Sequence, residues 1–304
     1  MRSELMKSKL TTLSDAVARI PAGASIALGG SLLRRQPMAL VHELIRQQKR
    51  DLTLLTWATT LATDMLAANG AIRRWEGIYA GFFRHGLAPN FRRAVQSGQI
   101  ETHDYSESAF VARFRAAAMG LPYLPSKALL GTGMQGKSPE EITPITCPFT
   151  GQPLLALKAA DTDFTLLHGY VADEYGNVQW PVVRDSDDID QMMASASKRL
   201  IVTVEKIIPH QQVQERPALT YIPHTLVEAL IEVPYAAHPT ATDGFYNEDE
   251  AALKGWLTAS ATAEGAAAWL REFVHGCPAR QDYVEKVGSL AALSALDVAR
   301  EFTV

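Results

Sequence analysis

The sequence predicts an α/β fold in which an open, mostly parallel sheet is flanked by helices. Short apolar runs alternate with segments of helical periodicity along most of the chain, a pattern typical of layered α/β folds. Within each run the apolar residues follow one another without alternation, which indicates strands buried on both faces. We interpret 1–304 as a single domain, with an irregular excursion near 135–160 and a helical C-terminal region at 247–304.

A capped helix and a buried strand open the chain. Thr12 is placed to cap a helix whose third residue is Asp15, and the helix ends near Ile20 because proline and glycine follow it. The apolar run at 25–28 then predicts a strand.

A glycine turn follows this strand. Gly29 and Gly30 are expected to stop the strand because glycine permits positive φ and close backbone approach, and Met38 begins a helix with one apolar face. Such a turn leaves backbone N–H groups free at a helix entrance, where an anion or a carbonyl oxygen can sit, and Arg34 and Arg35 add positive charge there. A side chain at Gly30 should therefore block the site without unfolding the chain. In the alternative reading the glycines only turn the chain, since neither dinucleotide-binding nor P-loop spacing is present.

The remaining elements follow in order from the same signals. Apolar runs predict strands at 52–57, 77–82, 100–103, 164–168, 178–180, 200–204 and 226–233. Apolar periodicity and caps predict helices at 63–68, 91–96, 106–119, 190–198, 248–257, 263–273 and 290–301. Three prolines and a glycine within 144–155 predict an irregular excursion or an edge hairpin.

Composition and charge narrow the class of protein. The net charge of -4 argues against nucleic acid or an anionic membrane as the main partner. Cys147 and Cys277 lie far apart, so we expect two free thiols rather than a disulfide framework, and a cytoplasmic location. We also expect no signal peptide, no membrane span and no metal site, because the sequence lacks the corresponding patterns.

Five short segments, spread over almost the whole chain, carry a family resemblance. In chain order they are 27–30 with 35–37, 116–125 (AAAMGLPYLP), 172–177 (ADEYGN), 203–208 (TVEKII), and 234–239 (PYAAHP) with 244–246. Together they resemble the alpha subunit of the family I CoA-transferases, in particular the glutaconate CoA-transferase branch.

The resemblance implies an enzyme subunit that works with a partner. It implies a homologous beta subunit, in a heterotetramer or heterooctamer, and a small-molecule acyl-CoA as substrate, with no permanently bound cofactor. In this family a glutamate of the beta chain attacks the acyl-CoA carbonyl, which is covalent catalysis by a carboxylate. Because this chain lacks the Ser-Glu-Asn-Gly type motif of that nucleophile, we expect it to be inactive alone.

Glu107 is the informative departure from the family pattern. The resemblance places it where the transferases carry a glutamine, whose amide donates to the developing oxyanion, whereas an ionised glutamate can only accept. A hydrolase branch, which opens steroid rings in CoA thioesters, resembles this chain in having a glutamate here and is thought to use it as an acid-base. Lys127 lies where that branch resembles an arginine position, and it could hold Glu107 ionised. In the alternative reading Glu107 is a solvated residue in the first turn of a helix.

Three further residues complete the candidate site. Phe82 and Phe83 lie in the segment that resembles the acyl pocket, although they could equally be core residues. His238 lies in a loop that the family places near the subunit interface, although a lone histidine is often structural. The leading hypothesis is a CoA-transferase alpha subunit. The alternatives are the alpha subunit of a ring-opening hydrolase and a non-catalytic CoA-binding homologue.

Overall fold

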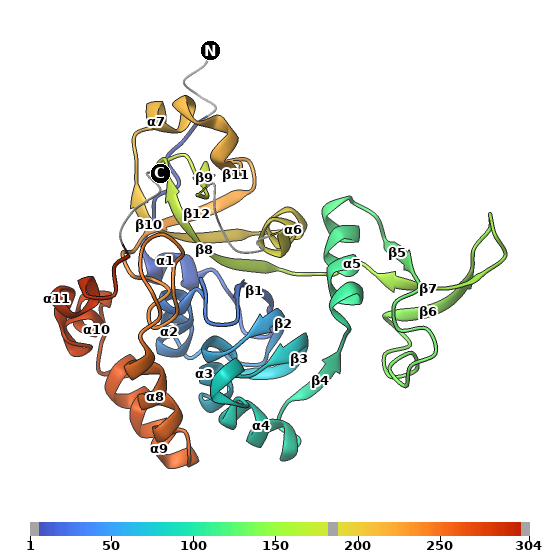
Figure 1. Cartoon of the computed structure of the whole chain (residues 1–304), viewed down its shortest axis with the longest axis horizontal. Coiled ribbons are helices and arrows are strands. Elements are labelled where there is room, and N and C mark those ends of the chain that lie inside the picture. Colours follow the sequence, from blue (N-terminus) through green and yellow to red (C-terminus); the bar gives the residue numbers. More distant parts are fainter. Residues whose placement is uncertain (1–5, 182–187, 299–304) are drawn as a thin grey trace.

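The computed structural model describes residues 6–181 and 188–298 and forms one large sheet with helices packed on both faces (Figure 1). Seven strands run parallel in the order β12-β10-β8-β1-β2-β3-β4. They are β1 Ser25–Ser31, β2 Leu52–Thr59, β3 Ile72–Ala80, β4 Glu101–Asp104, β8 Phe164–Ala172, β10 Leu200–Ile207 and β12 Val227–Glu232. Two short strands, β9 Val178–Gln179 and β11 Thr220–Ile222, add antiparallel pairs beyond β8. The predicted open, mostly parallel α/β sheet is confirmed.

Helices cover the two faces because side chains of the sheet alternate in direction. Ile26 and Leu28 of β1 enter one apolar cluster, and Ala27 between them enters another. The first cluster includes helices α1 Leu13–Ala18, α2 Met38–Arg46, α3 Leu61–Ala68, α4 Pro89–Gln96, α8 Glu250–Ala259 and α9 Ala263–Leu270. The second includes α5 Glu107–Ala118 and α6 Asp188–Ala196. None of the described helices is long and apolar enough to cross a membrane.

Shorter helical elements complete the described chain. They are η1 Phe83–His85, α7 His210–Glu215, η2 Pro217–Leu219, η3 Arg271–His275, α10 Arg280–Lys286 and α11 Ser289–Ser294. Cys147 and Cys277 are free thiols, as predicted.

The direction of winding reverses at β1. From β1 the chain adds β2, β3 and β4 on one side, then returns to place β8, β10 and β12 on the other. Ligands of open α/β sheets bind outside the carboxyl ends of the strands, near such a reversal, so this edge is the first place to look for a site.

The predicted excursion is a small antiparallel sheet. Its strands β5 Tyr123–Ser126, β7 Pro153–Lys158 and β6 Ile142–Thr146 pair in that order, and the hairpin formed by β6 and β7 projects from the body (Figure 1). Leu155 and Leu157 bury their side chains in the same cluster as α5, which attaches the sheet to the domain.

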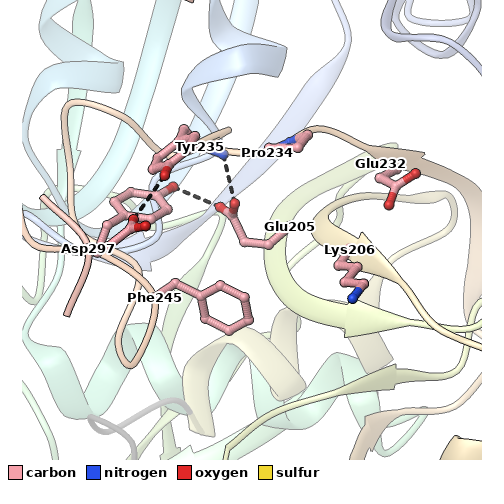
Figure 2. A pocket seen from close by; sticks show the side chains of 8 residues that line it. Glu205, Lys206, Glu232, Pro234, Tyr235, Phe245 and Asp297 are labelled. Carbon is pink, nitrogen blue, oxygen red and sulfur yellow. Dashed lines mark hydrogen bonds between the residues drawn. The ribbon is translucent and has the colours of Figure 1, made fainter. Parts of the chain in front are cut away.

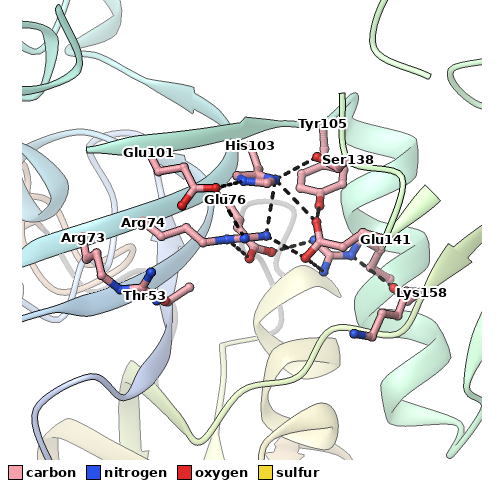
Figure 3. A network of polar contacts seen from close by, with 11 residues as sticks. Thr53, Arg73, Arg74, Glu76, Glu101, His103, Tyr105, Ser138, Glu141 and Lys158 are labelled. Atoms are coloured by element: carbon pink, nitrogen blue, oxygen red, sulfur yellow. Dashed lines mark hydrogen bonds and ion pairs between the residues drawn. The ribbon is translucent and has the colours of Figure 1, made fainter. Parts of the chain in front are cut away.

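Buried charges also fasten the excursion to β3 and β4 (Figure 3). Arg74 of β3 lies 2.8 Å from Glu141, at the start of the excursion hairpin, and 2.9 Å from Glu76. Arg113 of α5 approaches Glu76 at 2.8 Å, and His103 of β4 contacts Ser138 at 2.8 Å. Because each of these groups has a partner of opposite charge or a hydrogen bond, burial is tolerated.

The structure corrects three predicted elements. Strand β1 continues through Gly29 and Gly30 to Ser31, because Gly30, at φ +80°, forms a bulge in the strand rather than ending it. Helices α7 and α10 have no counterpart in the sequence-based prediction, since each spans only two turns or fewer. The predicted helix 290–301 is wrong in extent, because α11 ends at Ser294 and residues 299–301 lie outside the described part of the chain.

Candidate functional site

The carboxyl ends of β1, β2, β3 and β4 form a continuous edge, here called the β1–β4 edge. The Leu32 N–H donates to the Ala58 carbonyl at 2.8 Å, and the Gly81 N–H donates to the Thr59 carbonyl at 3.0 Å, so the loops leaving these strands are neighbours. The loops and the helix that follow these strands carry most of the predicted site residues: Gly29, Gly30, Arg34 and Arg35 after β1, Phe82 and Phe83 after β3, and Glu107 after β4.

The glycine turn is closely packed rather than open. The Gly30 N–H donates to the Asp190 carboxylate at 3.0 Å, so it is not free to bind a ligand. A Cβ at Gly30 would lie 2.6 Å from the carbonyl oxygens of Arg34 and Arg35, and a Cβ at Gly29 would lie 2.1 Å from Leu167. Both glycines are therefore required by packing, and the predicted open N–H at Gly30 is wrong.

The entrance of α2 is also occupied. The Arg35 N–H donates to the Ala241 carbonyl at 2.7 Å, and the Ala39 N–H donates to the Ala236 carbonyl at 2.9 Å. The loop after β12 thus uses these backbone donors, so the predicted anion position at this helix entrance is filled by the chain itself.

The two arginines of the turn are matched by acids. Arg35 is 1% exposed and lies 3.5 Å from Asp190 and 3.0 Å from Asp243. Arg34 pairs with the same Asp243. Burial raises the pKa of Asp190, while Arg35 and the Gly30 N–H oppose that rise. The positive charge of the turn is therefore balanced within the chain.

Glu107 stands at the β1–β4 edge in the open. It is the first residue of α5, whose N-cap Ser106 accepts from the Ala109 N–H at 3.3 Å. The Glu107 side chain is exposed and makes no hydrogen bond or ion pair with the described residues. Lys127, also exposed, donates to Gln152 at 2.9 Å rather than pairing with Glu107. The predicted Lys127–Glu107 ion pair is thus not formed in the isolated chain.

The two phenylalanines have opposite surroundings. Phe82 is fully buried in the apolar cluster beneath α2 and α3. Phe83 is 64% exposed, and its backbone N–H donates to the Tyr79 hydroxyl at 3.1 Å. Leu87, a few residues on, is also mostly exposed. Phe83 and Leu87 therefore form an apolar surface beside the end of β3.

His238 is enclosed within the fold. Its ring contacts the Tyr283 hydroxyl at 2.9 Å and the Asp249 carboxylate at 3.1 Å, and burial lowers its pKa. These contacts orient the loop that closes the entrance of α2, while the ring itself is inaccessible from the β1–β4 edge in this structure.

One cluster has donor atoms suited to a metal. His103, Glu140 and Glu141 offer ligand atoms that lie within 4.8 Å of one another. The Arg74 guanidinium already lies 2.8 Å from Glu141 and 3.3 Å from the His103 Nδ1 atom. A cation of the chain itself therefore occupies this position, and the arrangement fits a structural ion-pair network better than a metal centre.

Asp190 and Asp243 determine the shape of the turn, and no local pattern points to them. They lie 160 and 208 residues from their partners Gly30 and Arg35, in segments with no distinctive spacing. Gln36 stands out in the sequence only as part of a longer motif. Its buried side chain donates to Thr60 and accepts from the Ala62 N–H, which joins the turn to the start of α3.

Comparisons with known proteins agree with the fold. A family model described as coenzyme A transferase matches residues 10–233. An uncharacterized protein of Archaeoglobus fulgidus is 35% identical over 298 residues, which are 97% of this chain and 66% of that protein.

Two further relatives have named activities. The first is the A-type subunit of glutaconate CoA-transferase from Acidaminococcus fermentans, 32% identical over 300 residues, covering 93% of this chain and 92% of that protein. The crystal structure of glutaconate coenzyme A-transferase from that organism matches with a TM-score of 0.92 at 31% identity, over 97% of both chains. The second is the cholesterol ring-cleaving hydrolase IpdA subunit of Mycobacterium tuberculosis, 28% identical over 298 residues, covering 94% of this chain and 99% of that protein.

Proposed function

Because the chain belongs to the coenzyme A transferase family, we propose that it is the alpha subunit of a cytoplasmic, heteromeric CoA-transferase. The complex would move coenzyme A between an acyl-CoA thioester and a carboxylic acid. The match to a relative named as a transferase subunit, over nearly the full length of both chains, supports a protein that needs a second chain.

One observation carries the placement of the site. The exposed Glu107 carboxylate lies at the β1–β4 edge, where the apolar side chains of Phe83 and Leu87 are also exposed. Exposed apolar groups beside a polar group are typical of surfaces that another chain covers. A homologous beta subunit docked here would enclose Glu107 and bring its own nucleophile to the substrate.

The proposed reaction proceeds through covalent intermediates. A glutamate of the partner attacks the thioester carbonyl, the C–S bond breaks, and CoA leaves as a thiolate from a mixed anhydride. The thiolate then attacks the enzyme's own carbonyl of that anhydride, which releases the first acid and leaves an enzyme-CoA thioester. The second acid reverses these steps. Glu107, when protonated, would donate a hydrogen bond to the oxyanion that forms at the carbonyl.

A hydrolase is the second candidate, and the chemistry of Glu107 favours it. A carboxylate can take up and release a proton, which an amide cannot, and one relative is named as a ring-cleaving hydrolase subunit. In this candidate Glu107 would act as the acid-base in opening a ring of a cyclic acyl-CoA, without a glutamate nucleophile from the partner.

Co-expression with the product of the adjacent homologous gene tests the proposal. The chain alone and the purified complex would be assayed with a panel of acyl-CoA thioesters, with and without free acids. Transfer to an acid by the complex only would support the proposal. Ring opening without any acceptor acid would favour the hydrolase. CoA binding with neither reaction would indicate a non-catalytic homologue and contradict both.

A further inference from the structure

A cavity of about 250 Å³ lies outside the β1–β4 edge, where β10 and β12 end (Figure 2). The residues that line it come from the ends of these strands and from the segments around Tyr235, Phe245 and Asp297: Glu205, Lys206, Glu232, Pro234, Tyr235, Phe245, Tyr246 and Asp297. We refer to it as the β10–β12 cavity. The proposed transfer reaction assigns no role to it.

Aromatic rings form much of its wall. The rings of Tyr235 and Tyr246 lie 4.9 Å apart at an angle of 42°, and Phe245 lines the cavity beside them. The faces of such rings carry partial negative charge, and they attract organic cations whose own hydration is weak.

Glu205 contributes a buried carboxylate at the base of the cavity. Its Oε1 atom accepts from His168 at 2.7 Å and from the Tyr246 hydroxyl at 2.8 Å, and its Oε2 atom accepts from the Tyr235 N–H at 2.7 Å. A carboxylate offers about four acceptor positions, so these three bonds leave Oε2 able to accept one more. The cavity therefore presents an acceptor to its contents.

Two further carboxylates stand at the rim. Glu232 accepts from the Ile207 N–H at 2.9 Å, and Asp297 accepts from the Tyr235 hydroxyl at 2.9 Å, each through one oxygen. Lys206 is the cation among the lining residues, and Figure 2 shows its amine directed away from both Glu205 and Glu232. Three acids against one lysine disfavour an anionic occupant, such as a carboxylate or the phosphates of CoA.

We propose that the β10–β12 cavity binds a small alkylammonium ion. Aromatic faces would hold its alkyl groups, and the acids would balance its charge. The cavity is smaller than typical pockets for drug-sized ligands, which suits a trimethylammonium group and excludes a nucleotide. The site is separate from the CoA reaction and goes beyond it.

Choline and its uncharged isostere 3,3-dimethylbutan-1-ol test this proposal directly. Titration calorimetry on the full chain, without any acyl-CoA, should show saturable binding of choline and at least about fivefold weaker binding of the alcohol, since shape is kept and charge is lost. Glu232→Gln and Asp297→Asn keep the acceptor oxygens used by Ile207 and Tyr235 but remove the charges. Each should weaken choline binding by about threefold or more.

The matched control is Asp161→Asn, which removes an exposed acid that pairs with Lys198 away from the cavity. It should bind choline as the wild type does. Equal binding of choline and the alcohol, unchanged binding in both rim variants, or no saturation in the millimolar range would overturn the proposal. Thermal melting of each variant separates loss of binding from loss of folding, and if Asp297→Asn melts early, Glu232→Gln decides.

Discussion

The Asp190 carboxylate accepts a hydrogen bond from the backbone N–H of Gly30 at 3.0 Å, across 160 residues of sequence. The same carboxylate lies 3.5 Å from the buried guanidinium of Arg35. This contact fixes the bulge at the end of β1 and uses the donor that a ligand would need. The groups left to meet a substrate at the β1–β4 edge are therefore Glu107 and the exposed residues after β3.

Gly30→Val should unfold or severely destabilise the chain. The backbone at Gly30 has φ +80°, which a β-branched residue rarely adopts, and its Cβ would meet two carbonyl oxygens at 2.6 Å. A loss of at least about 2 kcal/mol in the free energy of unfolding is expected from the strain and the clash. Urea denaturation measures it. A normally stable variant that lacks only activity would restore the interpretation made from sequence, in which the glycine serves the ligand alone.

Arg113→Met should weaken the attachment of the excursion. Arg113 lies 2.8 Å from Glu76, 3.5 Å from Glu141 and 4.5 Å from the centre of the Tyr105 ring, so its loss leaves buried acids without a partner. Removing one member of a buried ion pair costs about 3–5 kcal/mol.

The control for this prediction is an exposed ion pair. Lys198→Met removes a lysine that contacts Asp161 at 2.6 Å in solvent, and should cost about 1 kcal/mol or less. Equal stabilities of the two variants in urea would show that the buried network does not hold the excursion.

His42→Phe should remove part of the loss of stability in acid. The His42 ring is buried 4.9 Å from Tyr283, and burial with the nearby Arg280 and Arg46 lowers its pKa well below 6.5. The native state therefore keeps His42 neutral, whereas the unfolded chain takes up a proton as the pH falls below 6.5. The resulting stability is present above this pH and is lost below it, by about 1.4 kcal/mol per pH unit.

Free energies of unfolding at pH 7.5 and pH 5.5 check this directly. The wild type should lose about 1.4 kcal/mol more than His42→Phe over this interval, because the unfolded wild type binds one more proton. Identical losses in both proteins would mean that His42 is protonated in the folded chain or does not differ between the two states.

Phe83→Ser should impair assembly without affecting the isolated chain. Phe83 is 64% exposed, and the Tyr79 hydroxyl contacts only its backbone N–H, which serine retains. A buried aromatic at an interface often contributes more than 1 kcal/mol, so affinity for the beta chain should fall by about tenfold or more. Phe149→Ser, at the tip of the β6–β7 hairpin and 94% exposed, is the matched control. Undiminished affinity of Phe83→Ser would place the interface elsewhere.

The layered fold could be predicted because it depends on local signals. Consecutive apolar residues in segments such as 25–28 and 200–204 indicate strands buried on both faces, and the structure places both in the parallel sheet. The position of Glu107 was also accessible, since Ser106 caps a helix directly after a strand.

The surroundings of the glycine turn could not be predicted from local sequence. Arg34 and Arg35 read as free positive charge because their counter-ions, Asp190 and Asp243, come from segments more than 150 residues away. Gly29 and Gly30 read as a strand end, because a bulge and a turn both require the same conformational freedom. Long-range partners decide between these readings, and no pattern in the sequence identifies them.

Paired substitutions at Glu107, assayed in the reconstituted complex, test the transferase assignment most directly. Acyl exchange between an acyl-CoA and an acid, and acceptor-independent ring opening, would be followed separately. Glu107→Gln supplies a permanent donor to the oxyanion, so acyl exchange should be preserved or raised. Glu107→Ala supplies none, so exchange should fall by about 10²–10³-fold. A fall of about 10²–10⁴-fold in Glu107→Gln as well, as expected for loss of an acid-base, would contradict the transferase account and assign the complex to hydrolysis.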